Sequence, residues 1–196
     1  MCGIVGLFIK DKALEPRLGE LTAQMLATMC ERGPDSAGFA VYGDAEDGKA
    51  KLTVQSASAD QDFAGLDAAL SKAIGAPVEI ERKSQKKIYA DPAFRAAIKA
   101  EHPGVRIMSA GETIEIYKEV GWPTDVSDRF HLKQMSGSHA IGHTRMATES
   151  AVTTLGAHPF STGADQCLVH NGSLSNHNSL KRRLKHDGMT FETEND

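Results

Sequence analysis

An apolar run from Ile4 to Phe8 begins almost at the start of the chain and ends before a charged stretch at residues 10–12. The run is far shorter than the roughly 20 residues of a membrane-spanning helix, and it predicts a short β-strand from Cys2 to Ile9. This strand constrains the whole fold, because a sheet has to form around the first residues. It also places the Cys2 thiol at the tip of a strand.

Removal of Met1 would give Cys2 both a thiol and a free α-amino group. An α-amino group titrates at about 7.7–8.0 and a free cysteine at about 8.5, so the amine can accept the proton of the thiol near neutral pH. The same pairing activates N-terminal threonine nucleophiles. The sequence therefore predicts an N-terminal nucleophile. The alternative is a small apolar residue that opens an edge strand.

The size and composition of the chain indicate one globular core. The chain has 196 residues, of which 40% are hydrophobic, and this suits one domain or one domain with an insertion. The first residues lack the basic region and the long apolar region of a signal peptide. We therefore expect a cytoplasmic protein with no membrane partner.

The charges and the cysteines argue against several kinds of site. The net charge of −4, with both signs interspersed, gives no basic surface for nucleic acid, and the short basic cluster at residues 181–185 is interpreted as a solvated helix face. The cysteines Cys2, Cys30 and Cys167 are widely spaced, which argues against a disulfide framework and against a metal site. We expect the last two to be buried structural thiols.

Helix and strand patterns alternate in the first quarter of the chain. Apolar residues at helical spacing predict a helix from Leu18 to Cys30, and turn-forming residues at 31–38 predict a loop. Phe39 to Tyr42 is a predicted second strand. Lys51 to Gln55 is a third, and it would complete a meander.

Residues 59–135 differ from the rest, because charged helix-like segments alternate there with turns that contain Pro and Gly. We interpret this range as an insertion or side layer. The elements predicted from residue 59 onward are helices at 63–74 and 91–100, strands at 138–145 and 166–170, and a helix at 176–185 that ends at Asp187 and Gly188.

Five short segments stand out by their residue types. They are Cys2-Gly3-Ile4-Val5-Gly6, Arg32 to Gly38, Gly142 to Thr148, His170-Asn171-Gly172 and Glu194-Asn195-Asp196. In this order and at these separations they resemble the motifs of class II glutamine amidotransferases, which are N-terminal-nucleophile hydrolases. The resemblance covers essentially the whole chain.

The resemblance implies an α+β fold, a four-layer α/β/β/α sandwich of two antiparallel sheets. It implies an amidotransferase domain over residues 2–196, with the insertion at 59–135 inside it. Members of the family continue with further strands beyond the position of Asp196, so we expect this domain to be incomplete at its C-terminal end.

The resemblance also implies hydrolysis of glutamine through Cys2. The thiolate would attack the side-chain carbonyl and form a thioester, and the α-amino group would deliver a proton to the departing ammonia. The family assigns the two oxyanion donors to the side-chain amide of Asn171 and the backbone N–H of Gly172. The alternative for this pair is a simple hairpin turn, for which Asn-Gly is a strong signal.

Glutamine also needs partners for its amino-acid end. By resemblance, Arg145 binds the α-carboxylate, Thr148 adds local hydrogen bonds and Asp196 binds the α-ammonium group. The alternatives are a surface ion pair for Arg145 and a frayed terminal residue for Asp196.

Three further residues are interpreted as supports of the site. Arg32 and Asp35 would fix the loop beside Cys2, and a purely structural role is an equal alternative. His143 is interpreted as a hydrogen-bonded core histidine, because the terminal amine already supplies the base.

Several features distinguish the chain from particular members of this family. Met146 follows the arginine where many relatives have an aromatic residue, and Glu149 stands where some synthases have histidine. Arg32 and Arg145 are 113 positions apart (145 − 32), which is long for the sugar-phosphate and purine members. The chain most resembles the separate glutaminase subunits of glutamate synthase-type enzymes, including N-methylglutamate synthase.

That resemblance implies a hetero-oligomer in which ammonia passes to a synthase subunit with flavin and an iron–sulfur cluster. We expect no cofactor in this chain, because it has no GxGxxG segment, no P-loop and no cysteine cluster. Two alternatives remain open. One is an N-terminal-nucleophile hydrolase of another amide, and the other is a catalytically silent subunit that binds a partner.

Overall fold

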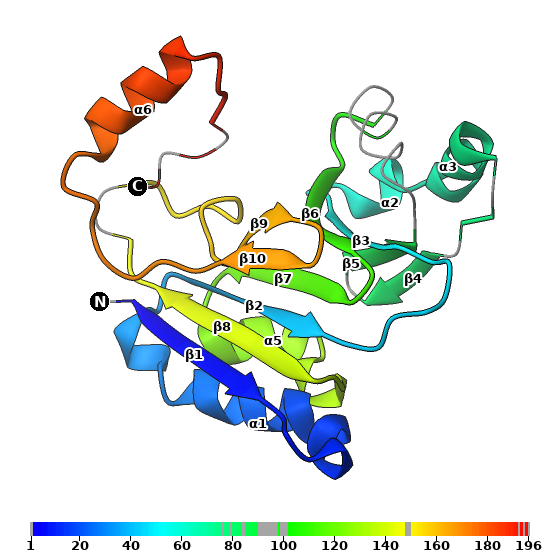
Figure 1. Ribbon diagram of the computed structural model, residues 1–196, viewed down its shortest axis with the longest axis horizontal. Coiled ribbons are helices and arrows are strands. Elements are labelled where there is room, and N and C mark those ends of the chain that lie inside the picture. Colours follow the sequence, from blue (N-terminus) through cyan, green and yellow to red (C-terminus); the bar gives the residue numbers. More distant parts are fainter. Residues whose placement is uncertain are drawn as a thin grey trace.

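The computed structural model describes residues 2–75, 77, 78, 80–83, 85–89, 98, 102–147, 150–191, 193 and 195. Within these residues the strands form two four-stranded sheets and one two-stranded sheet, and the strand pairs are antiparallel. Helices accompany both larger sheets (Figure 1). The fold therefore mixes helices with antiparallel sheets, which is consistent with the predicted α+β class.

The main sheet has the order β1-β8-β2-β7. Its strands are β1 (Gly3–Phe8), β8 (His139–Arg145), β2 (Ser36–Tyr42) and β7 (Ile114–Val120). Gly3 is paired with Thr144, and Ser36 is paired with Arg145. This register sets the first residues of the chain beside the C-terminal end of β8. The predicted strands at 2–9, 39–42 and 138–145 are confirmed.

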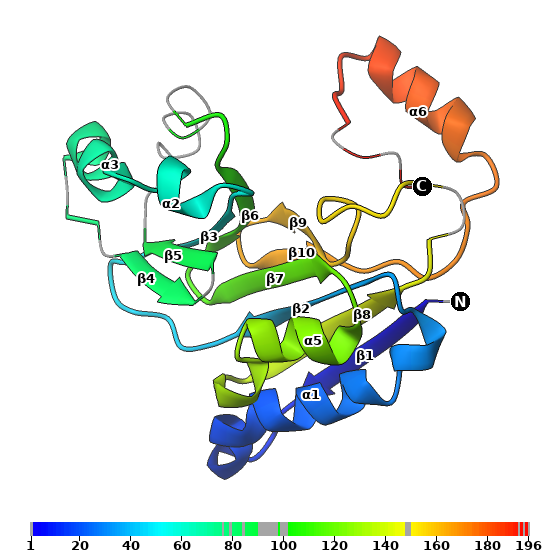
Figure 2. The same ribbon diagram turned by 180° about the vertical axis from the view of Figure 1, so that it is seen from behind.

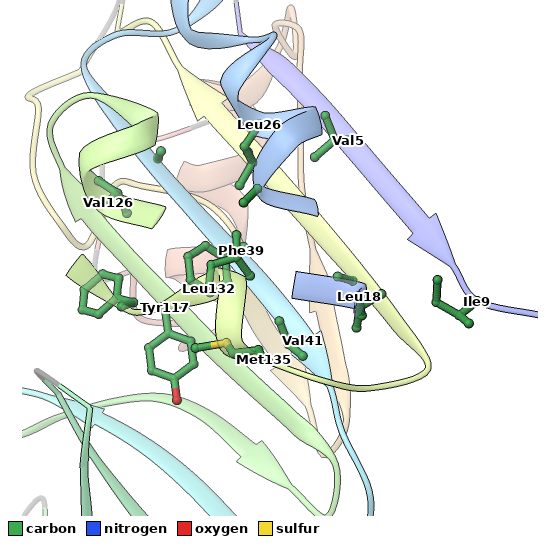
Figure 3. Close-up of a cluster of buried hydrophobic side chains, with 14 residues drawn as sticks. Val5, Ile9, Leu18, Leu26, Phe39, Val41, Tyr117, Val126, Leu132 and Met135 are labelled. Carbon is green, nitrogen blue, oxygen red and sulfur yellow. The ribbon is translucent and has the colours of Figure 1, made fainter. Parts of the chain in front are cut away.

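Helices cover one face of the main sheet (Figure 2). They are η1 (Lys12–Arg17), α1 (Leu18–Ala27), η2 (Cys30–Arg32), α5 (Pro123–Arg129) and η3 (Leu132–Gln134). Side chains at alternate strand positions point toward them, among them Val5, Phe39 and Tyr117 (Figure 3). The Phe39 and Tyr117 rings lie 5.6 Å apart by their centroids, so this face forms the apolar core.

The second sheet has the order β4-β5-β3-β6. Its strands are β4 (Ile80–Lys83), β5 (Gln85–Tyr89), β3 (Lys51–Gln55) and β6 (Arg106–Gly111), and the helices α2 (Ala59–Asp62) and α3 (Leu66–Ile74) accompany it. A separate apolar cluster includes Leu52, Phe63 and Leu66. This module therefore has a core of its own.

The predicted meander of three consecutive strands is wrong. β2 pairs with β7 and β8, whereas β3 pairs with β5 and β6. The strand at 51–55 was correctly predicted, but its partners come from later parts of the chain. Local sequence patterns carry no information about such partners.

The boundaries of the predicted insertion at 59–135 stay a prediction. Within this range the structure contains two different parts. β4, β5 and β6 extend the second sheet, whereas β7 and α5 belong to the main sheet and its helical layer. The predicted helix at 91–100 lies outside the described residues, apart from Ile98, which is buried in the second core.

A two-stranded sheet of β9 (Phe160–Gly163) and β10 (Gln166–Leu168) packs beside β6 and leads into α6 (His177–His186). None of the residues of α6 is buried, and Figure 1 shows the helix standing away from the main sheet. Lys181 of the predicted solvated cluster donates to the carbonyl of Thr193 at 3.1 Å. No helix in the described part of the chain combines the length and apolar character needed to cross a membrane.

The carboxylate of Asp165 joins the β9–β10 turn to the β6–β7 turn. It accepts hydrogen bonds from the backbone N–H groups of Glu112, Thr113 and Ile114 at 2.7–2.9 Å, and from the Thr113 hydroxyl at 2.7 Å. Burial raises the pKa of Asp165, but these hydrogen bonds outweigh burial, so its pKa is lowered overall. Asp165 therefore contributes stability in its ionised form.

We expect Asp165→Asn to lower the free energy of unfolding by about 1–2 kcal/mol, because the charged acceptor of several N–H groups is lost. The left-handed backbone at Asp165 (φ 53°) suits Asn, so the backbone should not be strained. The difference in unfolding free energy between the wild type and the variant should have its full size above about pH 4. It should disappear as the pH falls through the lowered pKa of the native carboxylate. Urea denaturation from pH 2.5 to 7 measures this difference.

Asp128→Asn is the matched control. Asp128 is an exposed carboxylate bonded to the exposed Lys133, and its replacement should change stability by less than about 0.5 kcal/mol. Equal effects of the two substitutions would contradict the role of Asp165.

Candidate active site

Cys2 lies directly before β1, at the end of the main sheet where β8 finishes. Its thiol is partly exposed, and Sγ lies 3.7 Å from the backbone carbonyl of Met146, the residue after β8. The antiparallel pairing of β1 with β8 produces this position, because Gly3 is paired with Thr144. The predicted place of the thiol at a strand tip is confirmed.

Asn171 reaches Cys2 from the β10–α6 loop, which comprises residues 169–176. Its side-chain Nδ2 donates to the backbone carbonyl of Cys2 at 3.1 Å. Gly172 has a φ of 154°, a backbone conformation in which a side chain is strained. The element that follows is α6 and not a paired strand, so the hairpin alternative for Asn171 and Gly172 is wrong.

Arg145 is the last residue of β8, and its side chain is buried. The guanidinium Nη1 donates to the carbonyl of Ala151 at 3.2 Å, and Nη2 donates to the Ser150 hydroxyl. The alternative of a surface ion pair is wrong, since Arg145 is only 5% exposed. Both acceptors are neutral, and a guanidinium has five N–H donors. Arg145 can therefore offer further donors to an anion.

Residues 150–157, which we call the clamp loop, surround this guanidinium. Asn195 ties the clamp loop to the last part of the chain, because its Oδ1 accepts from the Ser150 hydroxyl at 3.2 Å and its Nδ2 donates to the carbonyl of Gly156 at 2.8 Å. Sequence reasoning assigned no role to Ser150 or Asn195. Their positions depend on tertiary contacts, for which the sequence carries no local signal.

Thr148 and Asp196 lie outside the described residues, as does Glu149. Their roles stay predictions. Asp196 is the next residue in the sequence after Asn195, which is bonded to the clamp loop.

Asp35 supports the end of β8. Its Oδ2 accepts from the backbone N–H of Ala147 at 2.7 Å, and its own N–H donates to the carbonyl of Arg145 at 3.1 Å. Arg32 lies in η2 on the segment that leads to Asp35, and it is exposed. The structure thus joins Asp35 to the strand end that carries Arg145. The predicted support role of Arg32 stays a prediction.

His143 lies on β8, two residues before Arg145, and is completely buried. Its Nε2 is 2.8 Å from the carbonyl of His170 in the β10–α6 loop. A carbonyl can only accept, so Nε2 carries the hydrogen. Burial, with the charge of Arg145 as a lesser cause, lowers the pKa of His143 to about 4. His143 is thus buried and hydrogen-bonded, and its role as a support of the site stays a prediction.

A second buried imidazole stacks on the first. The rings of His143 and His158 lie 4.3 Å apart at an interplanar angle of 29°. Burial, followed by the nearby His143 and Lys118, lowers the pKa of His158 to about 3. Lys118 is itself buried and donates to the carbonyls of Leu155 and Ala157 at 3.2 and 2.8 Å. The two imidazoles are therefore neutral at pH 7, beside buried cations.

The other two cysteines have different surroundings from Cys2. Cys30 is buried, and Cys167 is partly buried with its sulfur 3.4 Å from the hydroxyl of Tyr42. Burial raises the pKa of the Cys167 thiol. Among the described residues, no group of three or more His, Cys, Asp or Glu side chains could hold a metal ion.

Comparisons with known proteins agree on one family. A family profile described as a glutamine amidotransferase domain matches residues 125–196. The chain is 61% identical over 201 residues to a glutamine amidotransferase-like protein, GlxB, from Rhizobium meliloti (strain 1021), and this alignment covers 100% of the chain and 66% of the relative. It is 32% identical over 211 residues to a putative glutamine amidotransferase from Methanothermobacter thermautotrophicus, covering 100% of the chain and 69% of the relative.

A third relative matches less of the chain. A glutamine–fructose-6-phosphate aminotransferase from Methanococcus maripaludis is 35% identical over 91 residues, which are 46% of the chain and 15% of that relative. The chain spans about two thirds of the lengths of the first two relatives.

Gly33 allows the segment before Asp35 to approach β8 closely. A Cβ at Gly33 would lie 2.4 Å from the carbonyl carbon of Thr144 and 2.6 Å from the backbone nitrogen of Arg145. We expect Gly33→Ala to lower the free energy of unfolding by about 1–3 kcal/mol, because backbone has to move to admit the methyl group. Gly6→Ala is the control, since the nearest atom to its Cβ would be 3.9 Å away. Equal urea midpoints for both variants would contradict this account.

The buried imidazoles predict a pH dependence of stability. Unfolded histidine binds a proton with a pKa of about 6.5, whereas native His143 and His158 do so only near 4 and 3. The unfolded state therefore binds more protons between these values, and stability should fall as the pH drops from about 6.5 to about 3. His158→Phe, which keeps an aromatic ring in the stack, should reduce the slope of urea midpoint against pH. The exposed His186→Gln should leave it unchanged.

Proposed function

Because the chain belongs to the glutamine amidotransferase family, we propose that it hydrolyses the side-chain amide of L-glutamine to glutamate and ammonia, with Cys2 as nucleophile after removal of Met1. The proposal places the chain in class II, the N-terminal-nucleophile hydrolases with a four-layer sandwich. One observation carries it. The side chain of Asn171 is bonded to the backbone of Cys2, beside the strand end that carries the buried Arg145.

The reaction needs a nucleophile and a donor for the oxyanion. The α-amino group accepts the proton of the Cys2 thiol, and the thiolate so formed attacks the amide carbon. The C–N bond of the tetrahedral intermediate then breaks, the proton goes to the leaving ammonia, and a thioester remains. Water attacks the thioester and releases glutamate and the thiol. Atoms and charges balance without a cofactor.

Asn171 is suited to stabilise the oxyanion while it holds Cys2. A side-chain amide has two N–H donors, and the bond to the Cys2 carbonyl uses only one of them. The second donor remains for the oxygen of the intermediate. In the proposal Gly172 adds its backbone N–H. Its φ of 154° is a conformation in which a residue with a side chain would be strained, which supports a special role for glycine here. Loss of one such donor typically costs about 2.7–4 kcal/mol of transition-state stabilisation.

The proposed binding of the amino-acid end relies on Arg145, Thr148 and Asp196. Arg145 supports it, because its buried guanidinium is bonded to two neutral oxygens and would gain from a carboxylate. Thr148 would add local hydrogen bonds, and Asp196 would bind the α-ammonium group. A buried ionic partner for each end would reject amides without a free amino-acid end.

We further propose a cytoplasmic glutaminase subunit of glutamate synthase type, which passes ammonia to a separate synthase subunit with flavin and an iron–sulfur cluster. This part rests on the resemblance of the sequence motifs. Ammonia is mostly protonated at neutral pH and is then a poor nucleophile, so direct transfer between subunits has a chemical advantage. The chain itself would hold no cofactor.

The proposal predicts one covalent adduct. We expect the full-length natural protein to lack Met1 and to take up one equivalent of 6-diazo-5-oxo-norleucine, a glutamine analogue that alkylates the nucleophile. Intact mass with peptide mapping locates the adduct on Cys2. Cys2→Ala should abolish labelling and glutamate release, whereas Cys167→Ala should keep both.

Arg145→Lys should raise KM for glutamine about 10–100-fold, because the bidentate contact with the carboxylate is lost.

Other outcomes would replace this function. Retained Met1 without an adduct would favour a catalytically silent subunit. Unchanged glutamine turnover in Arg145→Ala and Asp196→Ala would favour hydrolysis of another amide.

A further inference from the structure

One contact in the site has no part in the proposed chemistry. His143 lies on the face of β8 opposite α1, and its Nε2–H donates to the carbonyl of His170 at 2.8 Å. The strand and the loop are 27 residues apart in the sequence at this contact. In Figures 1 and 2 the chain after β10 passes the end of β8 on its way to α6. The contact therefore connects the main sheet to the segment that carries Asn171 and Gly172.

Stacked aromatic rings hold the His143 ring in its orientation. It stacks on His158, and the His158 ring meets Phe160 edge-on at 4.6 Å and 76°. The Lys118 ammonium lies 4.2 Å from the centre of the Phe160 ring and donates to the carbonyl of Ala157. A buried stack thus fixes the direction of Nε2–H toward the loop.

The polar ring is not required for packing alone. A phenyl ring would fill the same stack without a polar atom to bury. Nδ1 of His143 is buried and has no hydrogen-bond partner among the described residues, which is a destabilising arrangement. The hydrogen bond from Nε2 to His170 is therefore the feature that distinguishes histidine from phenylalanine here.

The carbonyl of His170 belongs to the peptide unit that joins His170 to Asn171. Because a peptide unit is planar, a hydrogen bond to this carbonyl fixes the plane from which the Asn171 backbone continues. Asn171 in turn contacts Cys2 through its side chain. A path of two hydrogen bonds thus runs from the rigid strand β8 through the loop to the nucleophile.

We propose that His143 is a positioning residue, which holds the Asn171-Gly172 segment against Cys2 by donating Nε2–H to the carbonyl of His170. The inference rests on the proposed glutaminase function and adds a residue that acts through the loop and not on the substrate. Without this hydrogen bond the loop samples more positions, and the donors of Asn171 and Gly172 miss the developing oxyanion for part of the time. The substrate contacts of Arg145 are unaffected.

The test compares three variants of the full-length protein. His143→Phe keeps the ring stack and removes the donor, and His143→Gln keeps a side-chain N–H. His139→Phe is the matched control, because His139 lies on the same face of β8 and stacks on Tyr42 at 3.9 Å, toward the other end of the strand. All three are measured for kcat and KM with glutamine, for the rate of Cys2 alkylation by iodoacetamide, and for hydrogen exchange of peptides that cover residues 169–176.

We expect His143→Phe to lower kcat about 10–100-fold, which is less than the loss of a whole oxyanion donor. KM should change by less than about threefold, because Arg145 keeps its contacts. Alkylation by iodoacetamide needs no oxyanion donor and should keep its rate. Hydrogen exchange in the loop should become faster. His143→Gln should recover part of kcat and of the loop protection, and His139→Phe should match the wild type.

Three results would overturn the proposal. They are unchanged kcat and unchanged loop exchange in His143→Phe, an equal loss in His139→Phe, and an equal slowing of iodoacetamide alkylation, which would place the effect on the thiol. If the wild type itself released no glutamate, the proposed function would fail. Hydrogen exchange of the loop would still decide whether His143 holds it.

Discussion

The pairing of β8 with β1 on one side and β2 on the other is the constraint on which the site depends. β8 is an inner strand, and its register with both neighbours is set by Gly3 opposite Thr144 and Ser36 opposite Arg145. A slip of one residue would turn every side chain of β8 to the other face. Cys2, Arg145 and His143 would then no longer share one end and one face of the sheet.

The two faces of the main sheet have different tasks. The face toward α1 and α5 is apolar, and Phe39, Tyr117 and Phe130 pack there. The opposite face of β8 carries His143 and Arg145 of the candidate site, whereas His139 and Ile141 lie on the same face farther from the site, against Tyr42 and an apolar cluster. Alternation along one strand therefore supplies both the core and the polar residues of the candidate site. The rigidity of the first face supports the geometry of the second.

Two of the buried cations lie near the site. Lys118 and Arg145 are both nearly inaccessible, and the described contacts of their charged groups are largely with carbonyl and hydroxyl oxygens and with the Phe160 ring. Isolated charges are costly to bury, so these contacts are necessary for stability. The neutral state of His143 and His158 follows from burial next to these cations. The buried guanidinium of Arg145 favours an anionic group on a ligand.

Local patterns in the sequence determined the elements and the chemistry that each segment offers. They predicted β1, α1, β3, β8 and α6 within a few residues, and the position of the Cys2 thiol at the tip of a strand. Helix and strand periodicity, turn residues and side-chain chemistry are properties of short stretches, so a single chain reveals them.

Only the tertiary structure decided which segments meet. In this structure β3 belongs to the second sheet, and β7, which comes from the range of the predicted insertion, belongs to the main sheet. Ser150 bonds to Arg145, and Asn195 bonds to Ser150. His143 also bonds to the carbonyl of His170. The Ser150–Asn195 contact links residues 45 positions apart, and the His143–His170 contact links residues 27 positions apart. Such contacts depend on the packing of the whole chain, so no local pattern encodes them.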